Sequence, residues 1–154
     1  MHVNYKKYIY FLLLFLIAGF AYTQVGFGLS YRLRPLIGYL LLAGYLFGVG
    51  LLLYTPLSYE PKLKKHFLIR LTVLTLVALI ILTPYWVLKQ QHDSLGAGYL
   101  FFFMSIGFST LIAIYTAVET IWLFTRKKYS QVFVNLLLAE GIYCLVLFSG
   151  LFGF

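Results

Sequence analysis

Residues 94–124, SLGAGYLFFFMSIGFSTLIAIYTAVETIWLF, contain one charged side chain, Glu119, and no proline. About 20 apolar residues in a helix are enough to cross roughly 30 Å of hydrocarbon, so this stretch is typical of a membrane-spanning helix. After Thr125, the basic residues Arg126, Lys127 and Lys128 end the apolar pattern. The stretch therefore predicts an integral membrane protein, and it predicts the longest of its helices.

The same pattern recurs along the chain, which is 62% hydrophobic and only 10% charged. An ordinary soluble domain is about 25% charged, so lipid has to cover much of this surface. We expect one all-α transmembrane domain, a polytopic bundle of five helices with short connections. Their expected ranges are about 8–27, 35–54, 67–88, 97–124 and 132–152.

Prolines mark two places where these helices are expected to break. Pro56 and Pro61 bracket a predicted turn after a second helix that ends near Tyr54. Pro84 cannot donate to the carbonyl of Ile80, so a kink or early end is expected between residues 83 and 86.

Basic residues predict the orientation of the bundle, because cytoplasmic loops carry an excess of Lys and Arg. One side collects nine of them, against three on the other. The nine are Lys6, Lys7, Lys62, Lys64, Lys65, Arg70, Arg126, Lys127 and Lys128; the three are Arg32, Arg34 and Lys89. This count places the amino terminus in the cytoplasm and the carboxyl terminus outside, with a bacterial inner membrane as the default.

The first apolar segment has a second interpretation. Lys6 and Lys7, the apolar run from Tyr8 and the sequence Gly19-Phe20-Ala21 resemble a secretory signal peptide with cleavage after Ala21. Cleavage would leave four spanning helices, and these would keep the same orientation.

The formal charge of +8 does not predict a nucleic-acid partner. Nucleic-acid binding needs a basic face, whereas these residues lie in short clusters between apolar stretches. The clusters are instead candidates for contact with anionic lipid headgroups. The candidate residues are Lys62, Lys64, Lys65, Arg126, Lys127 and Lys128.

Enzymatic and metal-binding motifs are absent from the sequence, so no cofactor, metal ligand or catalytic residue is expected. Cys144 is the sole cysteine, which excludes an intrachain disulfide, and its apolar surroundings favour a packing role. Asp93 is the sole aspartate, so one chain cannot form an aspartyl dyad.

Two of the four acidic residues, Glu119 and Glu140, fall inside predicted spans. They lie about 10 Å and about 18 Å from the nearest cytoplasmic cluster, where an unpaired carboxylate costs several kcal/mol. One hypothesis makes Glu140 a site for a proton, a cation or a polar substrate, with Glu119 as a second station. The other pairs Glu119 with Arg70 and has a protonated Glu140 bonded to a neighbouring Tyr or Thr.

Polar residues also form a stripe along one face of the fourth helix, because they follow helical steps of four, seven and three. The stripe comprises Ser105, Ser109, Thr116 and Glu119, with Thr120 beside it. It is either a polar pathway or a helix-packing face joined by interhelical hydrogen bonds.

Two further patterns concern helix packing. Gly44 and Gly48 form a GxxxG pair, which favours close helix packing, either within the monomer or between copies. The deeper tyrosines of the spans are expected to hydrogen-bond to neighbouring helices; they are Tyr39, Tyr45, Tyr115 and Tyr143.

With loops of roughly ten residues, the chain has little outside the bilayer for catalysis or signalling. The leading hypothesis is an accessory or structural subunit that packs against itself or a larger membrane complex. A small channel or transporter for protons, cations or a small polar solute comes second. A lipid-headgroup enzyme or flippase comes third.

Overall fold

The computed structural model describes residues 5–25, 33–91 and 94–148. In these ranges all elements are α-helices, and there is no strand. They are α1 (Tyr5–Val25), α2 (Leu33–Tyr59), α3 (Pro61–Gln90), α4 (Ser94–Thr125) and α5 (Tyr129–Phe148). Each is long and apolar enough to cross a membrane, so the predicted all-α class is confirmed for the described part of the chain.

Most helices extend beyond the predicted bounds. α2 passes through Pro56 and ends at Tyr59, and α3 passes through Pro84 and ends at Gln90. The expected end of α2 near Tyr54 is therefore wrong, and α3 does not end early at Pro84; the alternative, a kink between residues 83 and 86, stays a prediction. The predicted ends of the first and fifth helices, at 27 and 152, lie outside the described residues.

Pro84 does not end α3 because the cost of one missing hydrogen bond is small beside that of exposing backbone to lipid. Inside a bilayer the backbone has no water to bond to, so a helix that continues past a proline is favoured over an open turn. Thr83, just before the proline, also bonds its hydroxyl to the Leu79 carbonyl at 2.7 Å, within the same helical turn. The carbonyl that loses its helical donor at Pro84 is that of Ile80, so this bond does not replace the missing one.

The chain divides into two compact units. Unit 1 comprises residues 1–64 and 129–154, and unit 2 comprises residues 65–128. Unit 1 therefore contains α1, α2 and α5, and unit 2 contains α4 and almost all of α3.

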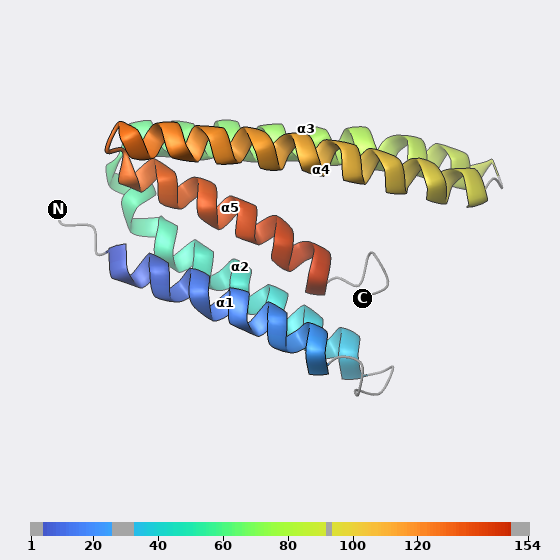
Figure 1. Cartoon of the computed structure of the whole chain (residues 1–154), viewed down its shortest axis with the longest axis horizontal. Coiled ribbons are helices and arrows are strands. Elements are labelled where there is room, and N and C mark those ends of the chain that lie inside the picture. Colours follow the sequence, from blue (N-terminus) through green and yellow to red (C-terminus); the bar gives the residue numbers. More distant parts are fainter. Residues whose placement is uncertain (1–4, 26–32, 92–93, 149–154) are drawn as a thin grey trace. The chain divides into compact units, whose positions relative to one another are not determined.

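In unit 1, α5 packs against both α1 and α2. α1 and α5 run in the same direction and α2 runs the opposite way (Figure 1). The core is aromatic, with Cys144 among the rings as the expected packing residue. Its buried members are Phe15, Tyr22, Tyr45, Cys144 and Phe148.

The glycines of unit 1 make room for aromatic rings. A side chain at Gly48 would collide with the Phe11 ring of α1, and one at Gly44 would lie 4.0 Å from Phe15 Cζ. The Gly44–Gly48 pair therefore packs within the chain, against rings of α1.

Unit 2 is an antiparallel pair of long helices, α3 and α4 (Figure 1). Near the connection between them, the rings of Tyr85 and Phe101 lie 5.2 Å apart. Near the opposite end, Arg70 of α3 reaches α4. The most apolar segment of α3 contains no buried residue.

α4 ends in a Schellman motif. The Lys128 N–H donates to the Leu123 carbonyl at 3.0 Å, and the Lys127 N–H donates to the Phe124 carbonyl at 3.0 Å. Lys127 has φ 56°, the left-handed conformation that this motif requires and that glycine usually supplies. The basic residues that end the apolar pattern in the sequence therefore also form the turn that ends α4.

Candidate functional site

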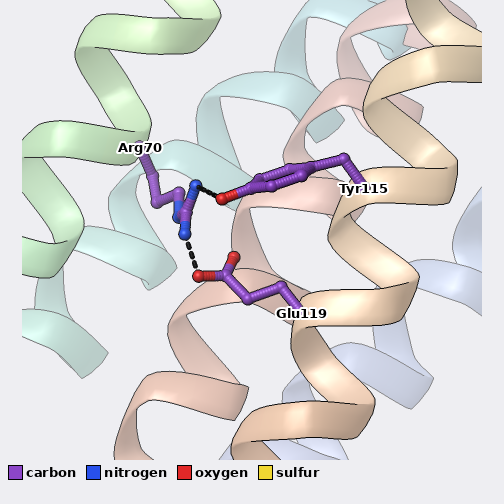
Figure 2. Close-up of polar contacts among 3 residues, drawn as sticks. All are labelled: Arg70, Tyr115 and Glu119. Carbon is purple, nitrogen blue, oxygen red and sulfur yellow. Dashed lines mark hydrogen bonds and ion pairs between the residues drawn. The ribbon is translucent and has the colours of Figure 1, made fainter.

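Arg70 of α3 bridges two residues of α4 inside unit 2, as Figure 2 shows. Tyr115 and Glu119 are one helical turn apart, so both side chains lie on the face of α4 that meets Arg70. One guanidinium nitrogen of Arg70 donates to the Tyr115 hydroxyl, and another donates to Glu119 Oε1. The guanidinium carbon also lies 4.9 Å from the centre of the Tyr115 ring.

This contact neutralises both charges. The side chains of Arg70 and Glu119 are only 18% and 14% exposed, and each supplies the counter-charge that the other needs at membrane depth. The structure thus brings together the two residues that the sequence favoured as a pair. Because the two charges pair with each other, this cluster favours a structural role.

Glu140 of α5 lies in a different environment, in unit 1. It is 6% exposed, and neither of its carboxyl oxygens has a hydrogen-bond partner among the residues that the structure describes. Its nearest polar neighbours include Tyr45 of α2 and Cys144, one turn farther along α5. Glu140 is therefore a buried carboxyl without a hydrogen-bond partner among the described residues.

Tyr45 is held beside Glu140 from two directions. Its ring packs against Phe11 and Phe15 of α1, with ring centres 5.5 Å and 5.0 Å apart. Its hydroxyl donates to the backbone carbonyl of Leu137 on α5. Because the single hydroxyl hydrogen is used in this bond, the Tyr45 oxygen can act toward any other neighbour only as an acceptor.

Tyr45 belongs to a set of three buried tyrosines in unit 1 that bind backbone carbonyls of a neighbouring helix. Tyr8 donates to the Leu52 carbonyl at 3.2 Å, and Tyr22 donates to the Arg34 carbonyl at 3.1 Å. Such hydroxyls fix the position of one helix against another, because the bond is directional and the ring is packed.

Each of the three carbonyls lies four residues before a glycine or a proline. The residue with the accepting carbonyl and the glycine or proline four positions later are Arg34 and Gly38, Leu52 and Pro56, and Leu137 and Gly141. A Cβ at Gly38 would lie 2.8 Å from the Tyr22 hydroxyl, and one at Gly141 would lie 3.3 Å from Tyr45 Cε1. The missing side chain gives the tyrosine access to the carbonyl.

Pro56 acts differently, through the backbone. It has no N–H, so the Leu52 carbonyl has no helical donor four residues later, and the Tyr8 hydroxyl supplies one. Sequence reasoning did not find this contact, because the partners are 44 residues apart. The signal it missed is the pairing of a buried tyrosine with a glycine or proline on the next helix.

The polar stripe of α4 is only partly covered. Ser105 is buried, Thr116 and Thr120 are half-buried, and Ser109 is exposed. Thr120 Oγ1 is buried and has no hydrogen-bond partner in the described ranges. The structure places Glu119 of this stripe with Arg70, inside unit 2.

The six headgroup candidates are all exposed: Lys62, Lys64, Lys65, Arg126, Lys127 and Lys128. The first two belong to unit 1 and the other four to unit 2. Trp122 lies between two of them, 5.5 Å from the Arg126 guanidinium and 5.6 Å from Lys128 Nζ. A tryptophan flanked by cations is typical of a membrane interface.

The described residues contain no cluster of three or more side chains that could hold a metal ion. Comparisons of the chain with protein-family models, with characterised proteins and with solved structures give no match. Any function therefore has to be argued from the chain's own residues.

Proposed function

We propose that this chain is a small membrane subunit that acts by packing, in the plane of the bilayer, against a second copy of itself or a larger membrane complex. The observation that carries the proposal is the small-residue face of α4, which is only partly covered: Ser105 is buried and Thr116 is half-buried. Gly98 and Ser109 on this face are exposed, and a Cβ at Gly98 would meet nothing within 4 Å.

Small residues favour helix association in membranes because they let backbones approach closely. Gly98, Ser105, Ser109 and Thr116 are separated by seven, four and seven residues, which keeps them on one side of α4. The pairing of Glu119 with Arg70 further supports packing over transport for this helix. A packing role also fits the apolar surface of α3 and α4, because the pair leaves most of it unburied within unit 2.

The proposal includes an orientation and a location. The amino terminus lies in the cytoplasm and the carboxyl terminus outside, in a bacterial inner membrane. The excess of Lys and Arg on the proposed cytoplasmic side supports this orientation. Reporter enzymes that are active on only one side of the membrane, fused to each terminus, test it directly.

Site-specific photo-crosslinking in native membranes tests the packing proposal. A photoreactive side chain at position 98 is expected to give a protein adduct, either a dimer of the chain or a complex with one partner. Position 107 is the matched control: Gly107 also has open space around its Cβ, but it lies two and a half turns farther along, on the opposite face. Lipid adducts alone from position 98, or equal protein adducts from both positions, would contradict the proposal.

A second candidate function is a pathway for protons, cations or a small polar solute through unit 1. The unpaired carboxyl of Glu140 favours it, because intramembrane carboxyls without a counter-charge are common in such pathways. Its test is ion or proton flux in proteoliposomes that contain the wild type or Glu140→Gln. Flux that disappears in the variant supports transport, whereas a wild type without flux leaves only the packing function.

A further inference from the structure

In their described parts, the three helices of unit 1, α1, α2 and α5, carry no lysine or arginine near their middle, where Glu140 lies on α5. α5 contains neither lysine nor arginine between Tyr129 and Phe148. In the described parts of α1 and α2 the basic residues Lys6, Lys7 and Arg34 all lie near a helix end. Arg34 is eleven residues from Tyr45, about 16 Å along α2.

An ionised carboxylate without a partner costs several kcal/mol at this depth, whereas an uncharged carboxyl costs much less. An uncharged carboxyl also gains a donor, its own O–H. The acceptor that the structure offers is the Tyr45 oxygen, whose hydrogen is already directed to the Leu137 carbonyl. The other titratable group beside it, the Cys144 thiol on α5, is a weak acceptor.

We propose that Glu140 is a proton-binding site in the interior of unit 1. The bound proton forms a hydrogen bond from the Glu140 carboxyl to the Tyr45 oxygen, and Tyr45 in turn donates to the Leu137 carbonyl. The result is a chain of two hydrogen bonds that links α5 to α2 and back to α5. This inference does not depend on the packing function, because it concerns unit 1 and not the exposed face of α4.

The site makes Glu140 a target for apolar carbodiimides that dissolve in the bilayer. The carboxyl transfers its proton to one carbodiimide nitrogen while its oxygen attacks the central carbon, which gives an O-acylisourea. Migration of the acyl group from oxygen to nitrogen then gives a stable N-acylurea. No group leaves, so the protein gains the mass of one whole carbodiimide.

The test treats the full-length protein in liposomes with dicyclohexylcarbodiimide and maps the adduct by mass spectrometry of peptides. The expected result is one adduct on Glu140 and none on Glu119, whose carboxylate is held by Arg70. The control uses a water-soluble carbodiimide with an added amine, which should modify the exposed Glu60 and not Glu140. The proposal is overturned if the apolar reagent leaves Glu140 unmodified, or if the water-soluble reagent modifies it.

Infrared spectroscopy gives a second readout that does not depend on reactivity. The carboxylic C=O band of the wild type should be absent from Glu140→Gln. In Tyr45→Phe it should remain but move to higher wavenumber, because the carboxyl loses its hydrogen-bond acceptor. A Tyr45→Phe spectrum identical to the wild type would contradict the proposed bond, and a wild type without the band would contradict the bound proton. Either result leaves the packing function intact, and absence of adducts from position 98 leaves the proton site intact.

Discussion

Gly141 gives Tyr45 access to the Leu137 carbonyl, so its missing side chain is part of the contact. We expect Gly141→Ala to lower the free energy of unfolding by about 1–2 kcal/mol, because the new methyl group pushes against a packed ring. Unfolding by sodium dodecyl sulfate in mixed micelles measures this change. The matched control is Gly50→Ala on α2, where a Cβ meets nothing within 4 Å.

Gly50→Ala should be neutral or stabilising by up to about 1 kcal/mol, since alanine is the better helix former. If Gly141→Ala and Gly50→Ala lower the free energy of unfolding equally, the effect comes from the backbone conformation of glycine and not from the space beside it. The Tyr45 contact would then not depend on Gly141.

The bond from Tyr8 to the Leu52 carbonyl should depend on Pro56, because the proline supplies no N–H. Tyr8→Phe in the wild type is expected to cost about 1 kcal/mol of unfolding free energy. In a Pro56→Ala background the new N–H bonds to Leu52 along the helix, so Tyr8→Phe should cost clearly less. A double-mutant cycle measures the difference. The same cost in both backgrounds would rule out this role of the proline.

Residue-scale contacts were predictable where charge decides them. Few groups can neutralise Glu119 at its expected depth. The sequence offered Arg70 as its partner, and the structure places Arg70 beside it. In unit 1 the expected hydrogen bond from Tyr45 to a neighbouring helix is confirmed, whereas the contacts of Tyr8 and Tyr22, and the carbonyl that each tyrosine binds, were not predicted. They depend on which face of each helix meets which neighbour, and a chain so rich in Leu and Phe has no clear polar face to indicate this.

At the scale of the helices, α3 and α4 are joined by a polar contact near one end and an aromatic contact near the other. In lipid the hydrophobic effect does not hold two apolar helices together, so such specific contacts carry more of the association. The contact of Arg70 with Tyr115 and Glu119 should therefore determine how the two helices align.

Removing one member of this pair leaves an unpaired charge at membrane depth. Arg70→Leu or Glu119→Leu alone is expected to destabilise unit 2 by roughly 3 kcal/mol, whereas the double variant should recover most of that loss. Unfolding titrations of the two single variants and the double variant provide the measurement. If the losses simply add, the ion pair does not couple the helices.

The existence of the five helices followed from apolar length and flanking charge, because the bilayer sets both. Their ends did not follow as well. Pro56 and Pro84 were expected to end or bend helices, as they would in water, but an apolar environment favours continued helical bonding. The left-handed Lys127 that ends α4 was also missed, since a lysine gives no signal of that conformation.

At the scale of the whole molecule, the two units use their polar residues differently. Unit 2 pairs its carboxyl with a guanidinium and exposes an apolar surface with a small-residue face. Unit 1 buries an unpaired carboxyl among aromatic rings and a tyrosine hydroxyl. We infer that association with other membrane components depends on unit 2, and that any chemistry in the membrane interior depends on Glu140.

The central claim is that the chain packs through α4. The most direct test measures, in liposomes, how many labelled copies of the chain associate with one another or with a partner. Single-molecule photobleaching gives the number of chains in each complex for the wild type, Gly98→Leu and Gly107→Leu. Each protein is measured by itself and again together with any partner protein that the crosslinking identifies. We expect Gly98→Leu to shift the population to single chains by at least about tenfold, a change of 1.4 kcal/mol in association free energy. Gly107→Leu should match the wild type. A Gly98→Leu protein that associates as well as the wild type would contradict the account.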